Sequence, residues 1–197
     1  MENPTRDDAW ALLCEYTESE SLRKHALCVE GVMRAFAEKV GGDADAWGMA
    51  GMLHDFDFEQ NPDINAHAKV GAGIMRERGW PEVLARAVES HNPATGVSRD
   101  SAMEKALYGV DELSGFIVAV ALVRPSKSIH DVKVKSVRKK MKEPAFARAV
   151  NRGDITQGAE ELGVDLADHI AAVIEAMRGI AGTIGLEGVG GAPRGGS

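Results

Sequence analysis

The chain has 197 residues, of which 44% are hydrophobic, and a formal net charge of −7 at pH 7. This size and composition predict one globular domain, or one domain with an appendage, that can bury a core. No run approaches the roughly 18 consecutive apolar residues of a membrane span, and from the acidic, polar N-terminus we expect no secretory signal. Two cysteines on apolar-periodic segments are typical of a reducing compartment, so we expect a cytoplasmic protein without a membrane partner.

The apolar pattern is helical nearly throughout. Hydrophobic residues recur at three- and four-residue steps, and glycine, proline and capping residues separate these runs. No alternation is long enough for a β-sheet, so we expect an all-α protein. The expected helices, in chain order, cover residues 7–17, 21–40, 43–54, a segment ending at 78, 81–91, 101–123, 130–142, 144–151, 154–162 and 165–180. Residues 1–181 would form one helical domain with a C-terminal extension from about residue 125, and the glycine-rich tail 182–197 would be disordered.

The adjacent pair His54-Asp55 is the most specific chemical feature of the chain. Two successive residues can chelate one metal ion only where the backbone turns, as at the C-terminus of a helix. The preceding run 46–53 is small and apolar, so it would bury the pair. A buried carboxylate beside a buried histidine is costly unless it is paired or bound to a metal. We therefore interpret both residues as metal ligands.

Two further residues fall on helix faces that point into a bundle. His25 lies four residues before Val29, on the apolar face of its helix, and Asp111 lies mid-helix without a basic partner one turn away. A single inward histidine is more often a hydrogen-bonded core residue, whereas an unpaired inward aspartate is expensive. Together with the His54-Asp55 pair, they indicate a site for a divalent transition metal, because imidazole and carboxylate suit Mn, Fe, Co, Ni or Zn.

The order His25, His54-Asp55, Asp111 resembles the HD-domain superfamily of metal-dependent phosphohydrolases. The flanking sequence strengthens the resemblance, which runs over roughly residues 20–125, and the chain to about residue 180 is similar to a bacterial branch of that superfamily. The matching segments are Arg23-Lys24-His25, Gly51-Met52-Leu53-His54-Asp55 and Val110-Asp111-Glu112-Leu113-Ser114-Gly115. The resemblance implies an HD-domain helical bundle, here with extra C-terminal helices, and hydrolysis of a phosphate by a metal-activated hydroxide.

Two more histidines bear on the number of ions that the resemblance implies. Members with four ligands hold one metal ion, whereas members with two further histidines before the final aspartate hold two, bridged by the carboxylate of the pair. His67 and His91 are similar to these extra ligands, and Asp55 would be the bridge. The alternative for His91 is a surface histidine stabilised by the dipole of the helix that it ends.

Catalytic and substrate-binding groups are expected beside the metals. The superfamily's commonest motif continues from the pair through a glycine and a lysine, and their absence removes the likeness to cyclic-dinucleotide phosphodiesterases. Asp57 and Glu59 are candidates for supporting the metal ligands or for acid–base catalysis, or else they are exposed loop acids. A phosphorylated substrate needs cations, for which Lys24, Arg124 and Lys127 are the nearest in sequence.

A basic segment, residues 124–152, follows the helix of Asp111. It holds ten basic residues against two acidic ones and is therefore either a phosphate-facing edge or a solvated face. The negative charge of the whole chain argues against generic nucleic-acid binding, so we expect a small phosphorylated substrate and no specific nucleic-acid partner.

The leading hypothesis is a phosphohydrolase acting on an ester or anhydride of a nucleotide or another small phosphorylated metabolite. A di-iron oxygenase is one alternative, because it shares the fold and a six-ligand site. A non-catalytic metal- or ligand-binding module is another, although a degenerate module has no need for all six ligands.

Overall fold

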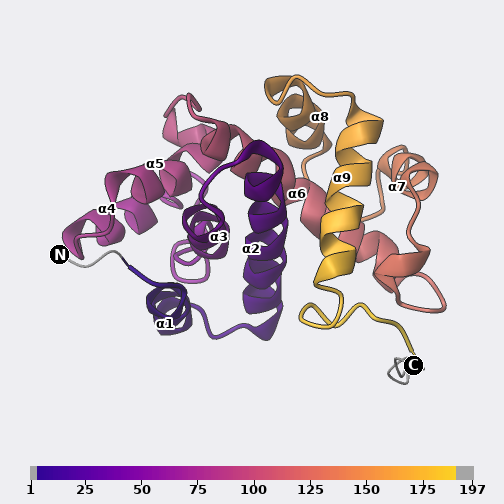
Figure 1. Ribbon diagram of the computed structural model, residues 1–197, viewed down its shortest axis with the longest axis horizontal. Helices are drawn as coiled ribbons and strands as arrows, with labels where there is room; N and C mark the ends of the chain where they lie inside the picture. The colour runs from indigo at the N-terminus through magenta and orange to yellow at the C-terminus, as the bar shows by residue number, and fades with distance from the viewer. Residues whose placement is uncertain (1–3, 190–197) are drawn as a thin grey trace.

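Helices make up nearly all of the ordered structure in the computed structural model, which describes residues 4–189 (Figure 1). No strand occurs in this range, so the prediction of an all-α protein is confirmed. The elements are α1 (Arg6–Tyr16), α2 (Glu20–Val40), α3 (Ala44–Leu53), α4 (Lys69–Glu77), α5 (Glu82–His91), η1 (Pro93–Thr95), α6 (Ala102–Leu122), η2 (Ile129–Asp131), α7 (Val134–Met141), α8 (Arg152–Glu161) and α9 (Leu166–Gly179). None of these helices is long and apolar enough to cross a membrane.

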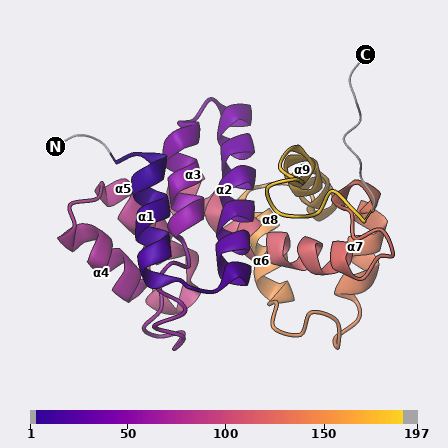
Figure 2. The ribbon, with the colours of Figure 1, turned by 90° about the horizontal axis from the view of Figure 1, so that it is seen from below.

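The long helices α2 and α6 form the frame on which the others pack. Helix α2 packs against α3 along much of its length, and α1 lies on the other side of α3, as Figure 2 shows. Helix α6 packs against α2 and α5 on one side and against α7, α8 and α9 on the other, so it joins the two sides of the molecule seen in Figure 1. The core between these helices includes the fully buried side chains Met33, Met52, Phe56, Leu107 and Phe116.

Capping residues explain where the frame helices begin and end. Helix α6 starts with a capping box between Ser101 and Glu104, at the position that the sequence predicts. Helix α2 begins one residue earlier than predicted, at Glu20, because the side chain of Ser19 is the N-cap and accepts the N–H of Leu22. It ends at Gly41, whose φ of 70° is the left-handed conformation that glycine adopts without strain.

The predicted helix over residues 144–151 is wrong. This segment consists of turns. Backbone carbonyls in and next to it accept hydrogen bonds from the guanidinium of Arg152 instead of from N–H groups four residues later, as in a helix. Ala147 has a φ of 40°, which interrupts a right-handed helix at this point.

The expectation of disorder from residue 182 is also wrong for the described part of the tail. Ile184 and Leu186 are buried in the core, and the N–H of Ile129 donates to the carbonyl of Leu186. Two apolar side chains therefore anchor residues 182–189 despite their glycine content. Residues 190–197, where the same expectation applies, lie outside the described residues.

Two glycines set the distance between α6 and α8. A Cβ atom placed on Gly158 would lie 2.5 Å from the Cα atom of Gly109, and one placed on Gly109 would meet Leu162 at 2.8 Å. The helices can approach this closely only because both positions lack a side chain. The contact brings the first turn of α8 beside α6, where the Tyr108 hydroxyl donates to Asp154 over 3.0 Å.

We predict that Gly158→Ala destabilises the protein by about 1–3 kcal/mol, since the added methyl group must push two backbones apart. Urea unfolding measures the change. Gly73→Ala is the matched control, because a Cβ at this helical position meets nothing within 4 Å. The control should be neutral or stabilising by about 0.5–1 kcal/mol. An equal loss of stability in both variants would contradict the close-packing argument.

Candidate metal centre

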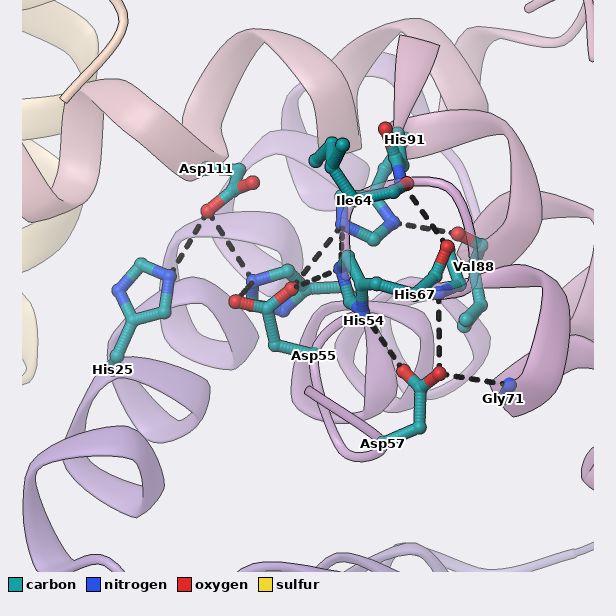
Figure 3. Close-up of polar contacts among 12 residues, drawn as sticks. His25, His54, Asp55, Asp57, Ile64, His67, Gly71, Val88, His91 and Asp111 are labelled. Carbon is teal, nitrogen blue, oxygen red and sulfur yellow. Dashed lines mark hydrogen bonds and ion pairs between the residues drawn. The ribbon is translucent and has the colours of Figure 1, made fainter. Parts of the chain in front are cut away.

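The six residues expected to bind metal converge in the interior of the bundle (Figure 3). They come from α2, from the ends of α3 and α5, from the loop before α4, and from the middle of α6. They form two groups that share Asp55, and the ligand atoms within each group lie within 4.8 Å of one another. The first group is His25, His54, Asp55 and Asp111, and the second is Asp55, His67 and His91.

Asp55 lies between the two groups. One of its oxygens lies 3.4 Å from Nε2 of His54, and the other lies 3.0 Å from Nε2 of His67 and 3.2 Å from Nε2 of His91. On the other side, the Asp111 carboxylate lies 2.9 Å from Nε2 of His25 and 3.2 Å from Nε2 of His54. The position of Asp55 is the one that the sequence resemblance implies for a carboxylate that bridges two ions.

The local fold explains how adjacent residues reach one centre. Helix α3 ends at Leu53, and the chain then makes successive turns to residue 60. Phe56 is fully buried and holds this turn in the core, and the hydroxyl of Thr17 donates to its carbonyl over 3.0 Å. The expected turn at the His54-Asp55 pair is thus present.

Hydrogen bonds at Nδ1 orient three of the imidazoles. Nδ1–H of His54 donates to the carbonyl of Gly51 over 2.8 Å, that of His91 to the carbonyl of Val88 over 2.6 Å, and that of His67 to the carboxylate of Asp57 over 3.0 Å. With Nδ1 protonated, each neutral ring presents the lone pair of Nε2 to the centre.

This donor set fits divalent cations. The Nε2 atoms of His67 and His91 are 3.3 Å apart and face the same Asp55 oxygen. Nε2 of His54 is buried without a hydrogen-bond partner among the described residues, although two carboxylates lie nearby. Lone pairs that face one another and face carboxylates repel unless protons or metal ions lie between them. Two aspartates and four imidazoles are a ligand set that suits Mn, Fe, Co, Ni or Zn.

Without metal, protons would take the place of the cations. Burial by itself would lower the pKa of His67, but the carboxylates of Asp55 and Asp57 raise it to about 9. Burial would likewise lower the pKa of His54, but the carboxylates of Asp55 and Asp111 raise it well above its ordinary value. Burial would raise the pKa of Asp55, but His54 holds it well below the ordinary range.

Neither Asp57 nor Glu59 faces the centre, so the expectation that they are acid–base groups is wrong. Asp57 instead has the other role expected for it, support of a metal ligand, and Glu59 is an exposed loop acid. Asp57 is fully buried, and its carboxylate accepts from His67 and from the N–H groups of Ala68 and Gly71. It therefore fixes the ring of a candidate ligand. The carboxylate of Glu59 accepts two backbone N–H groups before α2, at 2.6 and 3.1 Å.

The expected cations are not at the site either. A cavity of about 390 Å³ opens beside the two ligand groups, and Lys24, Arg124 and Lys127 are not among its lining residues. Lys24 and Lys127 are exposed, and the guanidinium of Arg124 donates to the carbonyl of Asp131 beyond the end of α6. The proline after Arg124 ends the helix without turning this side chain back to the metals.

The cavity is lined instead by four polar residues to which the sequence analysis gave no role, Asn92, Tyr108, Glu112 and Asp154. Burial, together with the charge of Asp111, raises the pKa of Glu112 to about 7. Tyr108 lies one turn before Asp111, so helical spacing places it on the same face, whereas the next residue, Glu112, does not follow from this spacing. Asp154 comes to the cavity only through the packing of α8 on α6.

Comparisons with known proteins agree with the geometry. The family model of the HD domain matches residues 22–173. A tRNA (cytidine(56)-2'-O)-methyltransferase from Thermoplasma volcanium is 30% identical over 122 residues, which cover 60% of this chain and 36% of that protein. The chain thus spans about a third of the length of this curated relative. No solved structure matches the chain significantly.

We predict that Asp55→Ala empties both metal positions, whereas His91→Ala lowers the metal content from about two ions per chain towards one. The difference follows from the place of Asp55 in both ligand groups and of His91 in one. Elemental analysis of protein purified without chelator measures it. His130→Ala, which removes an exposed histidine outside the site, is the control. Full metal content in Asp55→Ala protein would contradict the assignment.

We also predict that the metal-free protein loses stability as the pH rises. A histidine whose folded pKa lies above its unfolded value of about 6.5 stabilises the fold fully below that value. The contribution is lost as the pH passes through the folded pKa, which for His67 is about 9. The loss from this residue would be about 3 kcal/mol at most.

Urea unfolding at pH 6 and pH 9, with chelator and with manganese, tests this dependence. The metal-loaded protein should lose less stability, because bound metal replaces the protons. Metal-free protein that is equally stable at both pH values would show that these imidazoles do not carry the protons.

Proposed function

Because the chain belongs to the HD domain family, we propose that it is a metal-dependent hydrolase of a phosphate ester of a small metabolite. The observation that carries the proposal is the pair of ligand groups that share Asp55 beside an open cavity. Two ions that share a carboxylate are an arrangement suited to in-line displacement at phosphorus.

His25, His54 and Asp111 would hold one ion and His67 and His91 the other, with Asp55 bound to both. When bound, the ions would lower the pKa of a water molecule and neutralise charge on the phosphoryl oxygens. The residues around them fix this arrangement. Asp57 orients His67, and the amide of Asn92 donates to the carbonyl of His67 over 3.1 Å, which ties the loop to the end of α5.

Glu112 replaces Asp57 and Glu59 as the candidate for proton transfer. It lines the cavity next in sequence to Asp111, and it belongs to neither ligand group. Its carboxyl group is therefore placed to exchange a proton with the leaving oxygen of a bound ester.

The name of the methyltransferase relative does not lead us to propose methyl transfer. The match covers 36% of that protein, and the features on which the present proposal rests are the clustered metal ligands. A di-iron oxygenase could use the same six ligands, so the test must separate water from dioxygen as the reactant.

We predict that phosphate is released from small phosphomonoesters when Mn²⁺, Fe²⁺, Co²⁺, Ni²⁺ or Zn²⁺ is present, and that chelation stops the reaction. Asp57→Asn should lower metal affinity or kcat/KM about 10–100-fold, because the Asp57 carboxylate orients the ring of His67 through its Nδ1–H. Glu59→Gln is the matched control: an equally conservative change two residues away, outside the site.

Phosphate assays on air-equilibrated and anaerobic samples provide the readout. Release that is independent of metal, or equal losses in the two variants, would contradict the proposal. Turnover that needs ferrous iron and consumes oxygen would replace it with the oxygenase.

A further inference from the structure

The cavity beside the candidate metal centre has an acidic outer wall. Glu112 on α6 and Asp154 on α8 line it in addition to the ligand carboxylates of Asp55 and Asp111. Among residues 4–189, no lysine or arginine lines this cavity. This is unexpected for a site that must accept a phosphorylated substrate, since phosphate binding in proteins normally uses basic side chains.

The charges decide how many phosphate groups the site can accept. Two divalent ions would more than offset the charges of Asp55 and Asp111. One positive charge remains when the metal-bound water is ionised and two when it is neutral, which suits the dianion of one phosphate monoester. A second phosphate would meet the carboxylate of Asp154 and no lysine or arginine among the described lining residues. Unpaired charge in a partly buried cavity is costly. Nucleoside diphosphates and triphosphates are therefore disfavoured.

Asp154 offers one free acceptor to the organic part of a substrate. One of its oxygens accepts the hydroxyl of Tyr108 over 3.0 Å, and its other oxygen has no partner among the residues described. Arg99 lies 3.7 Å over the ring of Tyr108, but its guanidinium is engaged by Glu161 and by the carbonyl of Ser90. Asp154 thus lines the cavity and forms no ion pair among the described residues.

The remaining wall suits a short aliphatic spacer. Ile64, Pro93 and Val150 contribute apolar surface to the lining of the same cavity. The volume of about 390 Å³ lies near the lower end of the range of roughly 300–1,000 Å³ that is usual for ligand pockets. A small ester would fill this space.

We propose that the site selects phosphate monoesters whose organic group carries a positively charged amine, with Asp154 as the residue that determines this specificity. The inference rests on the phosphohydrolase function proposed for the same site. The phosphate would bind at the two ligand groups, the aliphatic spacer would cross the apolar wall, and the ammonium group would donate to Asp154.

A pair of esters that differ in one group tests the proposal on the manganese-loaded full chain. In 3-aminopropyl phosphate an ammonium group replaces the terminal hydroxyl of 3-hydroxypropyl phosphate. The amine should be preferred about tenfold or more in kcat/KM, as a charge-assisted hydrogen bond provides. Asp154→Asn keeps an oxygen for the Tyr108 hydroxyl but removes the charge, so the preference should fall close to one.

Asp168→Asn is the matched control. Asp168 occupies the same position in the first turn of α9 that Asp154 occupies in α8, and it is exposed outside the cavity. This variant loses the same charge and should retain the preference. Circular dichroism melting and manganese content show whether each variant is folded and loaded.

Binding calorimetry separates the substrate inference from the hydrolase function. The ligands are 3-aminopropylphosphonate and 3-hydroxypropylphosphonate, which cannot be hydrolysed as esters. Tighter binding of the amine without any turnover of the esters would contradict the hydrolase and support the selectivity. Equal binding of the two phosphonates together with equal kcat/KM for the two esters on wild-type protein would overturn the inference. So would tighter binding of pyrophosphate than of the aminophosphonate, or an unchanged preference in Asp154→Asn.

Discussion

The constraint on which the site depends is the crowding of lone pairs around the carboxylate of Asp55. Three imidazole nitrogens lie within 3.4 Å of its oxygens, and for each of these rings the other nitrogen donates to a carbonyl or carboxylate. Neutral rings would therefore present electron pairs to a buried anion. Only protons or metal ions can stabilise such a cluster. The ends of α3 and α5 and the loop before α4 are positioned so that the three nitrogens meet at this carboxylate.

The loop before α4 shows how much of the structure supports one imidazole. The Asp57 carboxylate binds His67 and the N–H groups of Ala68 and Gly71, and Ala68 adopts a φ of 67°. A non-glycine residue in this conformation costs about 1–2 kcal/mol. A Cβ on Gly71 would lie 3.0 Å from the Asp57 carboxylate, so the close approach of α4 requires glycine there. The strain and the close packing both hold the ring of His67 in the direction of Asp55.

The sequence predicted the parts of this arrangement that depend on local periodicity. The helix positions other than residues 144–151, the turn at the His54-Asp55 pair and the inward faces of His25 and Asp111 follow from helical spacing and capping, and the structure has them. The roles of Asp57 and Glu59 could not be separated in this way, because both are acids that follow the pair at two-residue steps. Only the fold separates them: the Asp57 carboxylate accepts an N–H at the start of α4, and the Glu59 carboxylate accepts one before the start of α2. For the same reason, nearness in sequence misassigned Lys24, Arg124 and Lys127 to substrate binding.

The ligands and the outer wall of the cavity come from different parts of the chain. All six ligands lie between residues 25 and 111, whereas Asp154 and Val150 belong to the segment that packs on α6 from its other side. The contact between Gly109 and Gly158 joins these parts, since it sets α8 against α6 within two residues of Asp111. A change on α8 can therefore alter the charge of the wall without moving a ligand. A change at the contact between Gly109 and Gly158 would instead displace the wall from the metals, and would therefore affect the wall and the ligands together.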